Sequence, residues 1–136
     1  MRSDWKLAIA VRDDLEPWQK LNVAVFVTSG MGTSFPDLIG EAYVDGSGVE
    51  YLPKLGLPCL IYAGDAQGVR RAFDRARSRG LATSPYTDDL FSTRNDEENR
   101  AAVAAVSTED LDIAGFAVAG EAKQVDKVFD KLKFHA

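Results

Sequence analysis

The stretch "WKLAIAVRDDLEPWQKLNVAVFV", residues 5–27, decides the fold. Residues 5–12 form a short continuous apolar run, which is typical of a strand covered on both faces. The two aspartates that follow are candidate helix caps, and Pro17 suits a first helical turn because its missing N–H has no intrahelical partner there. We therefore predict a buried strand and then a helix over residues 16–29, ended by "GMG".

The apolar residues of this helix go around its circumference, so we predict that the helix is largely buried. Asn22 lies among them. A buried amide without partners costs about 1–3 kcal/mol, so its hydrogen bonds must be specific. Two interpretations stay open: Asn22 fixes the backbone of a neighbouring loop, or it faces a ligand.

The rest of the chain alternates strands with amphipathic helices. "LIGEAYVDGSGVEYLP" predicts a hairpin with arms 39–44 and 49–52 around a turn at residues 45–48. Further buried strands are expected at residues 58–63 and 112–120, a short extended piece at 81–91, and helices at 66–79, 92–106 and 121–132. This pattern favours one α/β domain over residues 1–136, a three-layer α/β/α arrangement with a mixed, mainly parallel sheet.

Composition excludes several classes of function. The net charge of −5 opposes general attraction to nucleic acid, and the chain has no apolar run long enough to span a bilayer and no secretory signal, so we expect a soluble cytoplasmic protein. Cys59 and His135 are the only residues of their types. We therefore expect no disulfide, metal or cofactor, and a histidine-based nucleophile system would have to recruit the terminus.

Several segments together resemble a known bacterial family. "KLAIAVRDDLEPWQKLNVAVFV", "GEAYVD", "FSTRNDEENRAAVAA" and "DLDIAGFAVAGEAKQVDKVFDKLKFH" are similar to the uncharacterised domain-of-unknown-function 2000 family. That family in turn resembles the type 2 peptidyl-tRNA hydrolases, which begin with a strand, an Arg-x-Asp-Leu turn and a lysine-bearing helix. The resemblance implies their fold, with the hairpin of residues 39–52 as an insertion.

The resemblance also implies particular site residues. Arg12, Asp14 and Leu15 match the turn, Lys20 matches the hydrolase lysine, and residues 131–134 resemble the hydrolase tail. The helix positions that hold Gln and His in the hydrolases are Ala24 and Val27 here, which argues against an unchanged peptidyl-tRNA activity.

The candidate site lies at the end of the first strand, because ligands of such sheets bind beyond the carboxyl ends of the strands. A lysine at position 20 could neutralise an anionic ligand or a developing oxyanion. Alternatively, its stem covers apolar surface while the ammonium reaches water or pairs with Asp13 or Asp14. Asp14 itself could serve as a general base, or only as a cap.

Further candidate ligand-binding residues come from two helices. Arg12, Asn22 and Thr28 belong to the first strand and its helix, whereas Ser92, Thr93 and Asn95 lie at the start of "STRNDEENR". The free N–H groups of a helix start can hold an anion, although ordinary capping by these residues explains the same pattern.

Three functions remain open at this point. The first is binding of a small polar or anionic ligand in a pocket at the end of the first strand, with hydrolysis as one reaction that Lys20 and Asp14 could carry out. The second is peptidyl-tRNA hydrolysis, with tRNA held by the arginines of residues 70–79, which could equally be a solvated basic face. The third is a non-enzymatic homodimeric protein that pairs through its hairpin or another apolar face.

Overall fold

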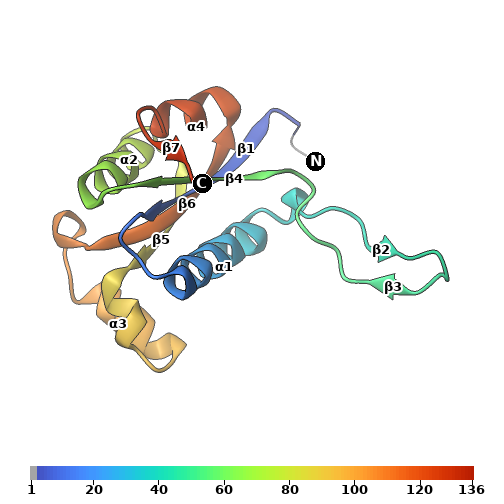
Figure 1. Ribbon diagram of the computed structural model, residues 1–136, viewed down its shortest axis with the longest axis horizontal. Helices are drawn as coiled ribbons and strands as arrows, with labels where there is room; N and C mark the ends of the chain where they lie inside the picture. The colour runs from blue at the N-terminus through green and yellow to red at the C-terminus, as the bar shows by residue number, and fades with distance from the viewer. Residues whose placement is uncertain (1–2) are drawn as a thin grey trace.

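The central strand of the structure is β1 (Trp5–Arg12), as the apolar run predicted. The computed structural model describes residues 3–136, and its five-stranded sheet has the order β5-β6-β1-β4-β7 (Figure 1). The other four strands are β4 (Cys59–Gly64), β5 (Ala82–Thr87), β6 (Ile113–Glu121) and β7 (Lys133–Phe134). The helices are α1 (Pro17–Ser34), α2 (Ala66–Ser78), α3 (Asp96–Ala104) and α4 (Ala122–Val128).

The prediction of a mainly parallel sheet is wrong. Only β1 and β4 pair in parallel, whereas β6 runs antiparallel to both β1 and β5, and β7 runs antiparallel to β4. Between β4 and β6 the chain forms α2, β5 and α3. Because β5 and β6 are antiparallel neighbours joined through α3, β6 runs opposite to β1 and β4. The sheet is therefore mixed, as predicted, with a single parallel pair.

The alternating side chains of β1 separate two cores on opposite faces of the sheet. Leu7, Ile9 and Val11 pack on the face covered by α1, and Ala8 and Ala10 pack on the face covered by α2 and α4. Figure 1 shows α1 on one side of the sheet and α2 and α4 on the other. The predicted three-layer α/β/α arrangement is confirmed.

The first helix departs from the sequence prediction at both ends. Its N-cap is Glu16, whose N–H donates to Gln19 Oε1 at 2.9 Å, so neither aspartate caps it. The helix does not stop at "GMG" but continues to Ser34. Gly30, within the helix, lets α1 pack closely against β5, because a Cβ at this position would lie 2.8 Å from Ser84 Oγ.

The prediction that this helix is largely buried is also wrong. Val23, Val27 and Met31 face the core, but Trp18, Leu21, Val25 and Phe26 are exposed by 54%, 69%, 67% and 52%. Asn22 lies on the same exposed side. Its amide therefore needs no internal partner, and the argument from the cost of a buried amide does not apply.

The predicted last helix is shorter than expected. It ends at Val128, and Lys131 adopts a positive φ of 75°, after which the chain turns back along the sheet. Residues 133 and 134 pair with Ala63 and Tyr62, and the N–H of His135 donates to Ile61 O at 2.9 Å. The tail is thus an edge strand, and its lone histidine is held beside β4.

The predicted hairpin forms an arm that projects from the body (Figure 1). We call residues 40–54 the arm; β2 (Tyr43–Val44) and β3 (Glu50–Tyr51) are its strands. The Asp45 carboxylate accepts the N–H groups of Ser47 and Val49, which closes the turn. Every residue from 41 to 54 is exposed. Within residues 3–136, no helix is long and apolar enough to cross a membrane.

Candidate functional site

A cavity of about 400 Å³ lies between the sheet and α1, beside the end of β1. Its walls come from β1, α1, β4 and the residue after β7, and they are mostly apolar: Val11, Pro17, Leu21, Ala24 and Ile61, with Lys20 and His135 as the polar members. Its size falls within the usual range for small-molecule sites. The predicted pocket near the end of the first strand has a counterpart here, but its lining is apolar rather than polar.

The polar end of this cavity is formed by Lys20 and His135. Lys20 Nζ lies 3.2 Å from His135 Nε2, and His135 Nδ1 lies 2.8 Å from Ala136 O. An ammonium only donates, so with Lys20 as the donor Nε2 accepts and Nδ1 carries the proton that is donated to Ala136 O. This geometry assigns a neutral imidazole beside a charged lysine.

Lys20 has no carboxylate partner. Among the ion pairs of residues 3–136, none includes Lys20, and Asp14 pairs with Arg12 instead. The alternative in which Asp13 or Asp14 neutralises Lys20 is therefore wrong. A half-buried ammonium that meets only a neutral imidazole leaves a positive charge available at the edge of an apolar cavity.

Arg12 and Asp14 belong to a separate cluster at the carboxyl end of β1. The Arg12 guanidinium donates to Asp14 at 3.0 Å, to Asp112 at 3.0 Å and to Asp88 at 3.2 Å. Burial by itself lowers the pKa of Arg12, but the hydrogen bond to Asp14 and the charges of the three carboxylates raise it overall. Arg12 thus fastens three segments together and has no donors directed at the Lys20 cavity.

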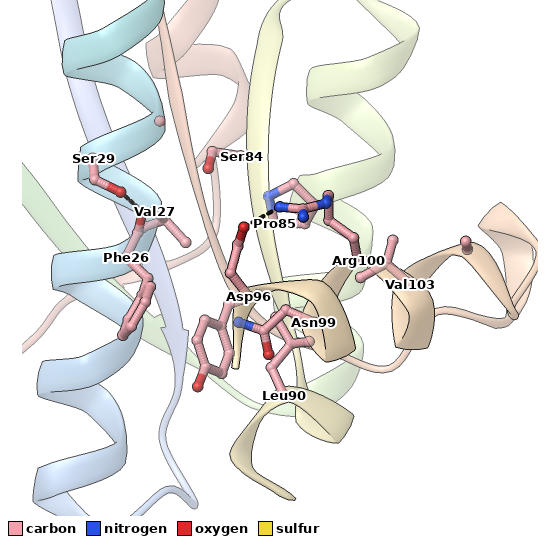
Figure 2. A pocket seen from close by; sticks show the side chains of 13 residues that line it. Phe26, Val27, Ser29, Ser84, Pro85, Leu90, Asp96, Asn99, Arg100 and Val103 are labelled. Carbon is pink, nitrogen blue, oxygen red and sulfur yellow. Dashed lines mark hydrogen bonds and ion pairs between the residues drawn. The ribbon is translucent and has the colours of Figure 1, made fainter. Parts of the chain in front are cut away.

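A larger cavity of about 590 Å³ lies between α1, β5 and α3 (Figure 2). Its two charged side chains pair with each other, Asp96 with Arg100, while Asn99 bonds to Thr93 and Ser29 Oγ donates to Phe26 O. Because its charges are neutralised internally, this cavity offers apolar space without an unpaired charge. It is the weaker candidate for an anionic ligand.

The remaining predicted site residues do not gather around one cavity. Asn22 is exposed on the outer side of α1, Thr28 is half-buried in the same helix, and Ser92 is exposed at the end of the 3₁₀ turn η2 (Asp88–Ser92). Asn95 caps α3 by accepting the N–H of Glu98 at 2.8 Å, and Thr93 Oγ1 donates to Leu90 O. For the start of α3, the capping interpretation is the one that the geometry matches.

The arginines of α2 are mostly used inside the molecule. Arg70 donates to the carbonyls of Leu111 and Thr108, Arg75 to those of Val128 and Asp130, and Arg79 to Gln124. These bonds fix loops to the helix and leave few arginines free for phosphates. In residues 3–136, no group of three or more His, Cys, Asp or Glu side chains is placed to hold a metal ion.

Sequence reasoning missed His135 and Ile61 as members of the site. The sequence of the tail hardly predicts a strand, since "KF" is too short to show a strand pattern. The pairing of these two residues with β4 depends on the turn at Lys131. Lys20 was found because it lies about one turn into the helix that follows the first strand and matches the lysine of the type 2 hydrolases.

Comparison with known proteins adds the family. A family model described as a protein of unknown function, DUF2000, matches residues 5–136. The chain belongs to the DUF2000 family. Among solved structures, the chain is similar to that of Atu0240, a protein of unknown function from Agrobacterium tumefaciens strain C58, with 37% identity and a TM-score of 0.94 over 98% of each chain. No curated protein is detectably similar in sequence.

Proposed function

We propose that this DUF2000 protein binds a small ligand that has an apolar body and one anionic group, such as a carboxylate. The body occupies the cavity between β1, α1 and β4, and the anionic group meets the Lys20 ammonium. The observation that carries the proposal is the free charge of Lys20 beside His135, at the polar end of an otherwise apolar cavity.

Both the apolar walls and the charged end of the cavity favour such a ligand. The binding free energy becomes more favourable by about 25 cal/mol for each Å² of apolar ligand surface that the walls remove from water. A carboxylate can accept from Lys20 Nζ, and such charge-assisted hydrogen bonds are stronger than neutral ones. Lys20 currently donates to neutral His135, so an anion offers it a better acceptor.

The test is an NMR titration with aryl and straight-chain carboxylates, starting with 4-phenylbutyrate and its uncharged amide. The carboxylate should shift backbone signals around Ala24 and Ile61 and bind more tightly than the amide. Lys20→Ala should weaken carboxylate binding about 10- to 100-fold, because a hydrogen bond to a charged group contributes about 1.5–3 kcal/mol. Lys20→Arg should retain most of the affinity.

Asn22→Ala is the matched control, because Asn22 is two residues from Lys20 on the same helix but lies on the exposed side. It should bind 4-phenylbutyrate as the parent does. If the carboxylate and the amide bind equally well, or if Lys20→Ala binds like the parent, no anion is recognised by this cavity and the proposal is wrong.

A second candidate, peptidyl-tRNA hydrolysis, is supported by the position of Lys20, which matches the lysine of the type 2 hydrolases and lies beside a neutral imidazole. In this candidate, His135 Nε2 takes a proton from the attacking water, and Lys20 stabilises the oxyanion of the ester carbonyl. The products are a free peptide carboxylate and the tRNA hydroxyl. The arginines of α2 weaken this candidate, since most are already bonded.

A cleavage assay with N-acetyl-aminoacyl-tRNA at low salt separates the two candidates, because phosphate contacts are strongest there. The hydrolase candidate requires cleavage that both Lys20→Ala and His135→Ala abolish. No cleavage above the uncatalysed rate removes this candidate and leaves ligand binding untouched.

A further inference from the structure

The outer side of α1 is an apolar surface that the described residues 3–136 leave more than half exposed, although Trp18 touches Phe91 and Phe26 touches Tyr86 at its border. Trp18, Leu21, Val25 and Phe26 follow one another at helical spacing, and each has at least half of its side chain exposed. We call these four residues the α1 face. Contiguous apolar patches of this kind mark interaction surfaces, because a monomer in water gains free energy by covering them.

The charge of the α1 face is compatible with a second copy of the same chain. Over residues 17–34, Lys20 is the only charged residue, and it faces the cavity rather than the α1 face. The whole chain carries a net charge of −5. Two copies therefore repel each other over most of their surfaces, and this carboxylate-free helix is a place where they can approach at little electrostatic cost.

The arm presents a second uncovered apolar surface. Tyr43 and Tyr51 lie opposite each other on one face of the hairpin, and Val44 lies on the other face, opposite Glu50. These residues, with Val49 and Leu52, are all more than half exposed. An isolated two-stranded hairpin is marginally stable in water, so an arm that projects alone needs a surface to lie on.

The arm and α1 have matching lengths and lie in line. Eighteen helical residues span about 27 Å, and the seven residues from the base of the arm to its tip span about 23 Å. Figure 1 shows the arm extending beyond the carboxyl end of α1. A twofold axis near the base of the arm would place each arm along the α1 face of the other copy.

We propose that the protein forms a twofold homodimer in which the arm of each copy covers the α1 face of the other. The contact is self-complementary, since the same two surfaces meet twice. The base of each arm lies near the carboxyl end of the partner's α1, and its tip lies near the amino end. Leu21 belongs both to the α1 face and to the wall of the Lys20 cavity, so the arm of the partner would border that cavity.

The available area is sufficient for a stable dimer. Only one face of the arm can lie on α1, and Tyr43, Val49 and Tyr51 share a face. With the four residues of the α1 face they make seven exposed side chains at about 100 Å² each, which gives about 700 Å² per copy. A standard specific interface buries about 800 Å² per partner. The apolar surface therefore supplies most of the area of a specific dimer, and the polar residues that border it supply the rest.

The first experiment measures molar mass by sedimentation equilibrium over a range of concentrations. The parent should show twice the 14.8 kDa mass of one chain. Leu21→Asp with Val25→Asp should shift the mass to that of a monomer, and so should replacement of residues 41–53 by two glycines. The deletion is feasible because the N–H of Gly40 already donates to Lys54 O at 2.8 Å. Ala101→Asp, at an exposed position of α3, is the matched control and should stay dimeric.

The second experiment identifies which surfaces meet. In a Cys59→Ala background, Val25→Cys and Tyr51→Cys are prepared separately and mixed under mild oxidation. The mixture should give disulfide-linked dimers, and each variant alone should give few. Circular dichroism of every variant verifies that it remains folded.

Three results would overturn the proposal. If the parent protein is still a monomer at high concentration, a second copy of the chain does not cover the α1 face or the arm. A dimer that survives the deletion of the arm uses another contact. Strong crosslinking of Val25→Cys with itself means that the two α1 faces pack directly and that the arm serves a different partner.

Discussion

Gly115 shows how a single residue sets the distance between layers. It lies on β6 opposite Val11, where the sheet meets α1. A Cβ at this position would lie 2.6 Å from Ala10 O and 2.6 Å from Val23 Cγ1. The carbonyl belongs to the central strand and cannot move without breaking the sheet, so we expect Gly115→Ala to destabilise the protein by about 1–3 kcal/mol, the usual cost of overpacking.

Urea denaturation of Gly115→Ala measures this cost directly. Gly46→Ala is the matched control, because a Cβ at Gly46 would meet nothing within 4 Å. The control should change the free energy of unfolding by less than about 0.5 kcal/mol. Equal effects of the two substitutions would mean that the close approach at Gly115 is relieved without cost.

At the residue scale, the sequence indicated Lys20 but misled about Asn22. Lys20 stood out because it lies one turn into the helix after the first strand and matches the hydrolase lysine, and a charge there must reach either water or a ligand. Asn22 looked buried because its neighbours are apolar. A sequence shows which residues are apolar but not whether another part of the protein packs on them. An exposed apolar face and a buried one therefore have the same sequence pattern.

At the scale of elements, Arg12 joins segments that are distant in the chain. It connects the end of β1 to Asp88 at the start of η2 and to Asp112 just before β6. We expect Arg12→Met to lower the free energy of unfolding by about 1–3 kcal/mol, because it leaves three carboxylates close together without their cation. This expected loss of free energy is smaller than the loss for a fully buried ion pair, since the three carboxylates are partly exposed and water screens their charges.

Thermal and urea unfolding of Arg12→Met, in low and high salt, provide the measurement. Added salt should reduce the loss, because it screens the repulsion among the three aspartates. Arg94→Met is a suitable comparison, since Arg94 is 86% exposed and pairs only with Glu98. That comparison should lose less than about 0.5 kcal/mol, and a similarly small loss for Arg12→Met would show that the three segments hold together without it.

Most elements were predictable because their signals are local. β1, β4, β6 and α2 fall within two residues of the predicted ranges, since apolar runs, caps and helical periodicity are short-range features. The tail was not predictable in the same way. β7 exists only because Lys133 and Phe134 find the edge of β4, a contact across seventy residues that no local pattern specifies.

At the scale of the whole molecule, strand direction was the main error. Alternation of strands and helices predicts crossovers, and crossovers usually give parallel pairs. Here β5 precedes α3, so the chain enters β6 from the opposite end of the sheet. Every residue of β6 from Ile113 to Gly120 is buried. A buried strand has the same apolar composition whether it runs parallel or antiparallel to β1, so composition could not distinguish the two directions.

The packing of the molecule also predicts how its stability responds to alkaline pH. Burial raises the pKa of the Cys59 thiol from an ordinary value of 9.0 to about 11. The folded state therefore favours the protonated thiol more than the unfolded state does. The corresponding stability is fully present below about pH 9 and is lost as the pH rises toward about 11.

We expect the parent protein to lose about 1–2 kcal/mol more stability than Cys59→Ala when the pH rises from about 8 to about 11, a value reduced for the partial exposure of the thiol. Urea unfolding of both proteins across this range gives the difference, in which the titration of shared groups cancels. Parallel pH profiles for the two proteins would contradict the prediction. In that case the thiol would ionise at the start of β4 as readily as in the unfolded chain, and water would have to reach the packing beneath α1.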